Sequence, residues 1–374
     1  MIYFDNAATG GFKPNSVTES AQTVMRYLCA NPGRSGHRLS VAGADLIMRC
    51  RESLGQLFVA SPDKVIFTKN CTEALNVAIF GSLKVGGHVI TTTFEHNSVL
   101  RPLFALKNKG LIELDIVSPF ENLSIFDAIK EKINPNTYLI VMTAVSNVTG
   151  LTLPIDKVSA LCKKQGIKLL IDGAQGGGHI PLSVDGSGIS MLALAGHKGL
   201  YGIMGSGVLI LDDDTDLSPL IYGGTGTESF NLNQPSTYPE RLEAGTLNLP
   251  AISALNEGVK FVSENMKNFS DNLFIQTRQI ISGISQIKNA NCYSNPNSSG
   301  IVAFSLDNLP STEVADILNS DYDVAVRGGL HCAPLTHAHL KTNVDGLVRV
   351  SLAVQNSSRE ITYFLSAIKE IAGR

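Results

Sequence analysis

The sequence lacks tryptophan, and its 374 residues include only six cysteines and 6% aromatic residues. The cysteines form no CxxC pair and are too sparse for a disulfide framework, which excludes a small disulfide-stapled domain. No segment reaches the roughly 18 uncharged apolar residues that a membrane-spanning helix requires. The start, MIYFDNAATGG, also has neither a cationic stretch nor a long apolar one. We therefore expect a cytoplasmic protein that does not contact a membrane.

The sequence also has no excess of positive charge, since its formal net charge is −3. Without a basic surface to attract phosphate backbones, nucleic acid is not expected as the main partner. The composition that is present, 44% hydrophobic and 17% charged residues, is that of an ordinary globular protein with a substantial core. A chain of this length is expected to form two domains rather than one.

Short β-rich runs alternate with longer helical patterns from Val65 onward, a rhythm typical of a parallel sheet with helical crossovers. Some of the apolar runs are continuous enough for strands that are buried on both faces. The runs that we interpret as strands in this part of the chain are VIFT, HVITTT, YLIVMTAV and KLLIDGAQ.

Residues 222–250 differ in composition from the alternating patterns before them, because they are rich in Gly, Thr, Asn and Pro and show no hydrophobic periodicity. Such a stretch is typical of a long functional loop. A helical pattern follows it, and then the strand-like runs GIVAFSL, VAVRGG and LVRVSL. We expect residues 16–250 to form a large α/β domain and residues 251–374 a smaller α+β domain. Residues 1–15 are expected to be an N-terminal segment that packs with the small domain.

Lys198 and Asp172 are candidates for a site at the sheet edge. Lys198 follows a histidine inside a glycine-rich turn, where a partly desolvated amine can form a Schiff base. The alternative is a solvated surface lysine. Asp172 falls at the carboxyl end of a predicted buried strand, where ligands of open α/β sheets collect. A carboxylate there suits a cofactor's pyridinium nitrogen, although an aspartate that caps a turn is the alternative.

An anion site is predicted in VIFTKNCTEALN, where a strand leads into a helix whose first turn contains Cys71 and Thr72. Free amides and the helix dipole at that point favour a phosphate. Thr72 has an alternative role as the N-cap, with Glu73 in the first turn. His96 follows another strand at the same edge and is a candidate for proton transfer, with a structural role as its alternative.

VAVRGGLHCAPL places Cys332 in a glycine-rich loop of the predicted small domain. A positive charge from His331 or Arg327 would favour the thiolate that nucleophilic attack requires. A buried loop cysteine is the alternative. Arg349 in LVRVSL suits a bidentate grip on a substrate carboxylate, and a surface ion pair is its alternative role.

In this order, the motifs resemble a known family over nearly the whole chain. The resemblance is to the class V aminotransferase fold and, within it, to the SufS-like (group II) cysteine desulfurases and selenocysteine lyases. It implies the pyridoxal-phosphate-dependent transferase fold type I, with a large, mainly parallel α/β domain and a smaller C-terminal α+β domain. The motifs that carry it are FDNAATGG, NPGRSGHRLS, FTKNCTEALN, EHNS, SNVTG, IDGAQ, GHK, RLEAGT, RGGLHCAP and VRVSL.

The resemblance also implies roles for individual residues. It makes Lys198 the Schiff-base lysine of pyridoxal 5'-phosphate, Asp172 the partner of its ring nitrogen and His96 the ring-stacking acid/base. It implies a homodimer in which Thr225 reaches the cofactor phosphate of the neighbouring subunit. The further cofactor contacts that it implies come from Asn147 and Gln175 to the phenolic oxygen and from Thr72 and His197 to the phosphate.

The same family pattern implies the reaction. L-cysteine would become L-alanine, with its carboxylate held by Arg349 and its sulfur left as a persulfide on Cys332 for an unidentified acceptor protein. Arg327, beside Cys332, and Arg34, in the NPGRSGH segment, are the other candidate substrate contacts. No metal is implied. Two departures from the pattern are Ala195, in place of a hydroxyl residue, and Asn70-Cys71, in place of Gly-Thr.

Three alternatives to this reaction stay open. A selenocysteine lyase acting on L-selenocysteine would use the same site but would need Cys332 less. A class V aminotransferase acting on a small amino acid would leave Cys332 with a structural role only. A non-catalytic scaffold in sulfur trafficking would have no need of the lysine, aspartate and cysteine together.

Overall fold

The computed structural model describes residues 1–119, 123–307 and 309–373. Its main element is a seven-stranded sheet in which β8 alone runs antiparallel to its neighbours. The mainly parallel sheet predicted from the sequence is therefore confirmed. In spatial order the strands are β2 (Val65–Thr68), β8 (Gly207–Leu211), β7 (Met191–Ala195), β6 (Lys168–Asp172), β5 (Thr137–Thr143), β3 (Gly87–Thr92) and β4 (Ile112–Val117).

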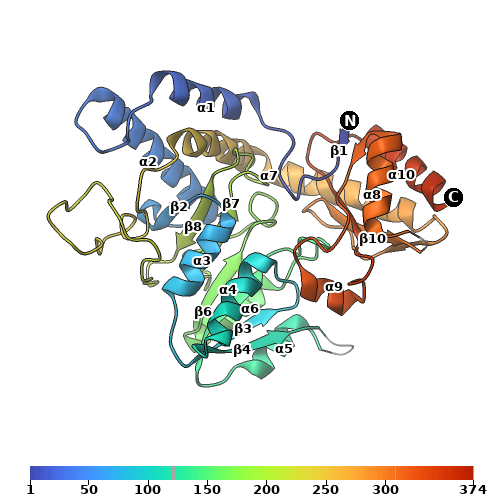
Figure 1. Cartoon of the computed structure of the whole chain (residues 1–374), viewed down its shortest axis with the longest axis horizontal. Helices are drawn as coiled ribbons and strands as arrows, with labels where there is room; N and C mark the ends of the chain where they lie inside the picture. The colour runs from blue at the N-terminus through green and yellow to red at the C-terminus, as the bar shows by residue number, and fades with distance from the viewer. Residues whose placement is uncertain (120–122, 308, 374) are drawn as a thin grey trace.

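Helices cover both faces of this sheet, and together they form what we call the large unit (Figure 1). Successive strand residues point to opposite faces, so that Phe67 packs in one hydrophobic cluster and Ile66 in the other. The cluster that contains Phe67 includes side chains from α2 (Arg38–Phe58), α5 (Ile125–Lys132), α6 (Ile155–Gln165) and α7 (Leu249–Ile284). The opposite cluster includes side chains from α3 (Cys71–Gly81) and α4 (Asn97–Asn108).

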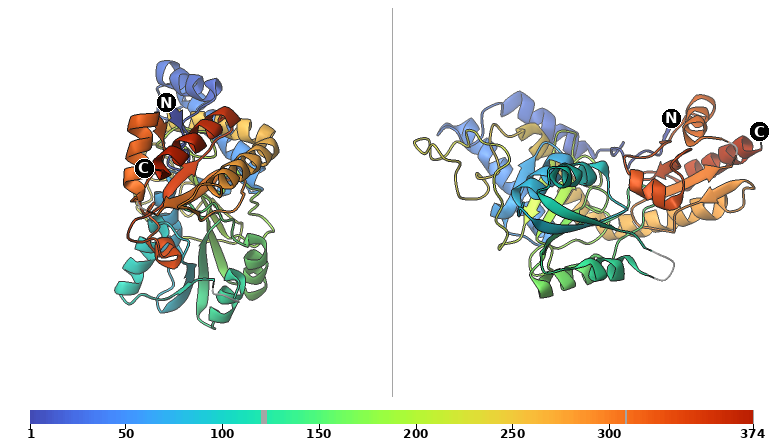
Figure 2. Two further views of the ribbon diagram at one scale, coloured as in Figure 1. Left: turned by 90° about the vertical axis from the view of Figure 1, so that its right-hand side faces the viewer. Right: turned by 60° about the horizontal axis from the view of Figure 1, so that its bottom comes forward.

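A second, antiparallel sheet forms the small unit, which lies beside the large unit in Figures 1 and 2. Helices α8 and α10 and the second half of α7 pack on it around Phe304 and Phe364. Phe4 from the N-terminal segment joins the same cluster, with its ring centroid 5.7 Å from that of Phe364. The elements of this unit are β12 (Val348–Ser351), β10 (Ile301–Leu306), β9 (Ala290–Cys292), α8 (Ser311–Tyr322) and α10 (Ser358–Ala372).

Four further strands and α-helices of the described chain lie outside the two larger sheets and their covering helices. Strand β1 (Ile2–Tyr3) pairs in parallel with β11 (Val324–Ala325), which places the N-terminus on the small unit. Helix α1 (Asn15–Tyr27) packs along α7, and α9 (Pro334–Leu340) follows the Cys332 loop.

Helix α7 connects the two units. It begins at residue 249, and its first half contributes Leu255 to the core of the large unit. Its second half contributes Ile280 to the core of the small unit. The expected boundary at residue 250 thus falls in the first turn of a helix that belongs to both cores. None of the described helices is long and apolar enough to cross a lipid bilayer.

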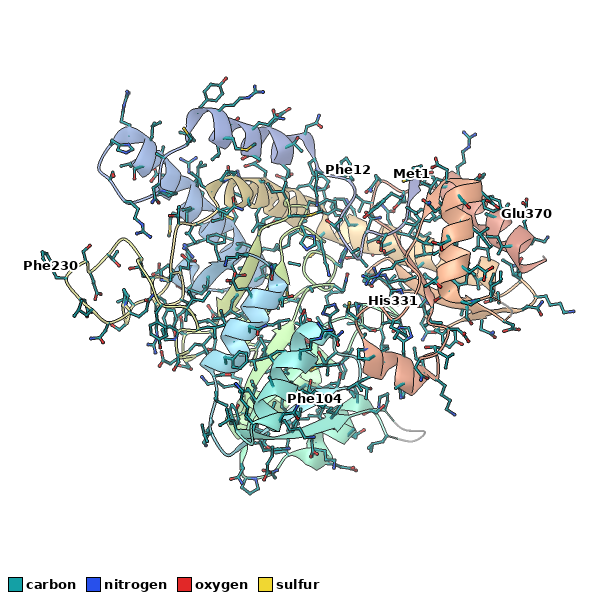
Figure 3. All side chains as sticks on the ribbon, viewed as in Figure 1. Met1, Phe12, Phe104, Phe230, His331 and Glu370 are labelled. Carbon is teal, nitrogen blue, oxygen red and sulfur yellow. The ribbon has the colours of Figure 1, made fainter. Side chains whose placement is uncertain are left out.

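No helix or strand lies between residues 211 and 249, where the sequence predicts a long loop. Phe230, labelled in Figure 3, is fully exposed at the far end of this segment. The other end of the loop is held by Glu243, which pairs with Arg51 at 2.6 Å. Both side chains are 6% exposed. Glu243 also accepts the backbone N–H of Phe67 at 2.6 Å, and Arg51 donates to the carbonyl of Val65.

We predict that Arg51→Met lowers the free energy of unfolding by about 3–5 kcal/mol, because it leaves a buried carboxylate without its partner. Adding Glu243→Gln should recover most of this loss, since glutamine is neutral and still accepts from Phe67. Urea unfolding of both variants and of the wild type measures the difference. A single variant as stable as the double variant would contradict a role for this charge pair.

Candidate active site

A cavity of about 100 Å³ opens where the parallel strands of the main sheet end. The last residues of β5, β6 and β7, which are Thr143, Asp172 and Ala195, form part of its wall. Parallel strands of one sheet end at the same edge, so residues distant in sequence meet there. We call it the sheet-edge cavity. The predicted site residues that line it are Cys71, Thr72, His96, Asn147, Asp172, Gln175, His197 and Lys198.

Lys198 lies in the turn between β7 and β8. The next residue, Gly199, packs so closely that an added Cβ would lie 2.3 Å from the carbonyl oxygen of Gly177. Burial lowers the pKa of Lys198, although Cys71 and Asp172 oppose this effect. More of its amine is therefore uncharged and nucleophilic than in an exposed lysine. The alternative of a solvated surface lysine is wrong.

Asp172 is the last residue of β6 and is buried. Its Oδ1 accepts the backbone N–H of Ala174 at 2.9 Å and the thiol of Cys71 at 3.6 Å. Burial raises the pKa of Cys71 well above its usual value, and the nearby carboxylate raises it further. Cys71 therefore stays protonated as a donor. Asp172 both caps the turn after its strand and faces the cavity, so its two sequence interpretations are compatible.

Helix α3 begins at the cavity, and its N-cap is Asn70, whose Oδ1 accepts the backbone N–H of Glu73 at 2.9 Å. The alternative interpretation of Thr72 as the N-cap is wrong, because Asn70 already occupies that position. The hydroxyl of Thr72 instead lies 2.8 Å from that of Ser98. The first-turn amides of a helix have no partner within it, so this end of α3 suits an anion.

The two histidines of the cavity are neutral. His96 caps α4, with its Nδ1 accepting the backbone N–H of Ser98 at 3.0 Å. The ring proton is then on Nε2. Burial lowers the pKa of His96, and burial together with the charges of Lys198 and Lys13 lowers the pKa of His197 to about 4. Either ring can therefore exchange a hydrogen bond with a ligand without bringing a charge.

Asn147 has an atom available to a ligand. Its Nδ2 donates to the carbonyl of His331 at 2.8 Å. Its Oδ1 is buried and has no hydrogen-bond partner in the described part of the chain. A buried polar atom without a partner is costly, and at a cavity wall a bound group can satisfy it. Gln175 differs, because its Nε2 donates to the carbonyl of Ala7 at 2.9 Å.

Arg349 does not line the cavity, and its side chain is 1% exposed. Its Nη2 contacts Asp5 Oδ1 at 2.9 Å, and its Nη1 donates to the carbonyl of Asn147 at 3.0 Å. Its Nε is buried without a partner among the described atoms. The surface ion pair weighed from the sequence is thus wrong, because the guanidinium of this pair is buried, although Asp5 is partly exposed. The predicted grip on a substrate carboxylate stays a prediction.

Cys332 is exposed, and the alternative of a buried loop cysteine is wrong. Its Sγ lies 3.8 Å from Arg327 Nη2, and its carbonyl accepts the backbone N–H of Asn97 at 2.7 Å. His331 cannot supply the positive charge considered above, because burial lowers its pKa to about 2. Of the two predicted sources of charge, only Arg327 remains.

Arg34 and Thr225 lie outside the sheet-edge cavity. They line another cavity, between the segment around residue 33 and the long loop, where Arg34 Nη2 donates to the carbonyl of Gly224 at 3.0 Å. Thr225 lies 3.1 Å from the hydroxyl of Thr227. The predicted contact of Thr225 with a neighbouring subunit stays a prediction.

By its fold and its site, the protein falls in a class of α/β proteins that consist of two units. Proteins of this class hold a lysine and a buried carboxylate where the strands of the main sheet end. The same fold occurs in the solved apo structure of the cysteine desulfurase from Thermococcus onnurineus NA1. The TM-score is 0.92 at 29% identity, with coverage of 100% of this chain and 94% of that chain.

The sequence profile of the aminotransferase class-V family matches residues 2–364, and the chain belongs to this family. The predicted family resemblance is confirmed at this level. The probable cysteine desulfurase of Pyrococcus abyssi is 32% identical, with 99% of this chain and 94% of that protein covered. The probable cysteine desulfurase of Methanothermobacter thermautotrophicus is 29% identical, with 100% and 95% covered.

Several residues around the cavity were missed in the sequence. Lys13 donates to the carbonyl of His197 at 2.8 Å, and burial lowers its pKa to about 8. Asp5 pairs with Arg349. Both belong to the N-terminal FDNAATGGFK stretch, but their partners are so distant in sequence that no local pattern reveals the pairing. Ser98, in EHNS, carries the clearest local signal, because it stands two residues after a candidate histidine.

Glu95 is the fourth residue that was missed, and it is fully buried directly before His96. Its Oε1 accepts from the hydroxyl of Thr92 at 2.6 Å and from the backbone N–H of Thr143 at 3.1 Å. Its Oε2 has no partner in the described structure. Burial raises the pKa of Glu95 to about 8, and the carboxylate of Asp172 adds to the rise. Glu95 is therefore largely protonated at neutral pH.

A carboxyl whose pKa is raised on folding stabilises the protein below its unfolded value and loses that contribution as pH rises through its folded value. We therefore predict that Glu95→Gln stabilises the protein relative to wild type, with a gap that widens from about pH 5 to about pH 8. The gap in the free energy of unfolding between the two proteins should not exceed roughly 5 kcal/mol, because a pKa shift of one unit corresponds to about 1.4 kcal/mol.

Urea unfolding across this pH range measures the gap, and Glu113→Gln, at an exposed position on β4, is the matched control. A gap between Glu95→Gln and wild type that is constant with pH would contradict a buried, protonated Glu95.

Proposed function

We propose that the chain is a pyridoxal-phosphate-dependent cysteine desulfurase that converts L-cysteine to L-alanine and holds the sulfur as a persulfide on Cys332. One observation carries the proposal. The exposed Cys332 belongs to a loop of the small unit that hydrogen-bonds to Asn147, which lines the sheet-edge cavity, and to Asn97, which stands between the cavity residues His96 and Ser98. The names of the similar proteins support the same reaction. The short RGGLHCAP loop supports the group II branch.

The cavity residues fit the cofactor. Lys198 would bind it covalently, and Asp172 would face the ring nitrogen. Thr72, in the first turn of α3, and His197, in the turn between β7 and β8, would hold the phosphate. The unpartnered Oδ1 of Asn147 and the lowered pKa of Lys198 both suit such a ligand. When bound, pyridoxal phosphate supplies an electron sink for negative charge at the substrate α-carbon. His96, Gln175 and Cys71 would complete the contacts around the ring.

The residues of the chain would supply proton transfer and the sulfur nucleophile. Lys198 accepts the substrate α-proton, because burial lowers its pKa. The Cys332 thiolate forms a bond to the substrate sulfur as the carbon–sulfur bond breaks. The electron pair of that bond remains with the three-carbon fragment, which takes up one proton at its β-carbon, regains a proton at its α-carbon from Lys198 and leaves as alanine. The persulfide on Cys332 then passes its outer sulfur to an acceptor protein.

The substrate carboxylate would bind Arg349, whose Nε lacks a partner in the described structure. Asp5 already occupies one side of this guanidinium, so the substrate would share it rather than find it free. Arg327 lies beside the Cys332 sulfur and would stabilise the negative charge that the thiolate brings.

A second copy of the chain would complete the site. Thr225 and Arg34 lie together at the base of the long loop, outside this chain's own sheet-edge cavity. The loop projects away from the large unit, with Phe230 at its far end (Figure 3). In a homodimer, this projecting segment would bring Thr225 to the phosphate held by the other subunit.

We predict that Cys332→Ala, loaded with cofactor, releases neither alanine nor sulfide from L-cysteine in the presence of a reductant, while wild type releases both. Both products and the cofactor absorbance are measured. Equal alanine and sulfide release by the two proteins would contradict the assignment of Cys332 as the sulfur carrier. Activity of Cys332→Ala on L-selenocysteine alone would favour a selenocysteine lyase, and amino-group transfer to a keto acid by wild type would favour an aminotransferase.

Lys198→Ala is expected to lose the visible absorbance of the bound cofactor and at least about a thousandfold in alanine release, because it removes both the covalent anchor and the base. Lys69→Ala is the matched control, since Lys69 is an exposed lysine just before α3. An absorbance spectrum that survives Lys198→Ala would contradict the assignment.

A further inference from the structure

The Cys332 loop contains two consecutive left-handed residues, neither of which is glycine. The φ angles are +51° at His331 and +56° at Cys332. Such a conformation costs about 1–3 kcal/mol for each non-glycine residue and persists only where the surroundings hold it. The contacts that hold this turn therefore decide where the Cys332 sulfur lies.

Two of these contacts come from the large unit, through the carbonyls of His331 and Cys332 described above. The others come from the small unit, where the backbone of Arg327 pairs with that of Arg349 and the backbone of Gly329 with that of Leu347. Two further contacts from this unit are made by the His331 ring. The ring is 2% exposed and lies where the two units meet (Figure 3). Its Nε2 is 3.2 Å from the carbonyl oxygen of Arg327, and its Nδ1 is 3.4 Å from His337 Nε2.

His337 stands on α9 and is fully buried. Its ring is nearly coplanar with that of His331, with the centroids 5.6 Å apart and an angle of 22° between the planes, so the two rings meet edge to edge. Its Nδ1 lies 2.9 Å from the hydroxyl of Thr342. The two imidazoles thus form a chain of hydrogen bonds from Thr342 to Arg327.

The groups at the two ends of this series of hydrogen bonds decide which atoms donate and which accept. The carbonyl of Arg327 can only accept, so His331 carries its proton on Nε2. Burial keeps both rings neutral, so His331 Nδ1 is an acceptor. His337 must then donate from Nε2, and its Nδ1 must accept from Thr342. One tautomer of each ring satisfies every contact.

We propose that His337 is a positioning residue for Cys332. It fixes the tautomer and plane of His331, which in turn holds the main chain of Arg327 and, with it, the guanidinium 3.8 Å from the Cys332 sulfur. His337 itself does not line the sheet-edge cavity. The effect of His337 on catalysis rests on the proposed function. Its effect on the position of the Cys332 thiol does not depend on that function.

The test compares His337→Leu, which removes the donor, with His337→Gln, whose side-chain amide can still donate to His331 Nδ1. The rate of alkylation of Cys332 by iodoacetamide is measured peptide by peptide. Cys29, which is also exposed, serves as the internal reference within each protein. We expect the Cys332 rate to fall about tenfold relative to Cys29 in His337→Leu, because the sulfur loses its fixed cationic neighbour. His337→Gln should stay within about twofold of wild type.

Alanine release from L-cysteine provides the second measurement. In His337→Leu, kcat should fall roughly tenfold to a hundredfold, because small displacements of a reacting group are costly. KM should change less than kcat, since Arg349, the predicted contact of the substrate carboxylate, keeps its own partners Asp5 and Asn147. His337→Gln should restore kcat. If His337→Leu behaves as wild type, or if His337→Gln is as impaired as His337→Leu, the proposal is overturned.

Thr342 provides an independent pair of variants in case His337→Leu does not fold. Thr342→Val removes the hydroxyl that fixes the His337 tautomer, and Thr342→Ser keeps it. A fall in Cys332 alkylation in the valine variant alone is expected, and equal rates in both variants would overturn the proposal. If wild type releases no alanine, the proposed function fails, while the alkylation comparison still decides whether His337 positions the thiol.

Discussion

The buried guanidinium of Arg349 lies where three parts of the chain meet, and the rest of the site depends on that junction. An unpaired charge in such a place would be very costly, so its partners must stay in position. They are the carboxylate of Asp5 in the N-terminal segment and the carbonyl of Asn147 after β5. Through them the N-terminal segment and strand β12 of the small unit are fixed against the sheet edge of the large unit.

The same junction supports the candidate catalytic groups on both sides of the cavity. From Asp5 the chain continues to Gly10 and Lys13, which donate to the carbonyl of His197 at 3.0 Å and 2.8 Å. They thereby hold the turn that carries Lys198. Asn147 donates to the carbonyl of His331 and so holds the Cys332 loop. One buried charge thus connects the lysine turn, the cavity wall and the thiol loop.

Burial also sets the protonation states of the site. It lowers the pKa values of Lys198, His96 and His197 and raises those of Glu95 and Cys71. Each shift favours the uncharged form, because desolvation penalises charge. A site built in this way brings little charge of its own to a bound ligand, apart from Asp172 and the arginines. Neutral amine, imidazole and amide groups are then available for proton exchange and hydrogen bonding.

The sequence by itself determined the parallel α/β organisation and the candidate residues at or just after the ends of its strands, among them Asp172 and His96. These follow from periodicity and from local turn chemistry, which short stretches of chain contain in full. Only the tertiary structure decided the pairing of Asp5 with Arg349, 344 positions apart, and the protonated state of Glu95. It also decided that His331 is neutral. Burial and long-range contacts belong to the packed chain, so no local pattern could reveal them.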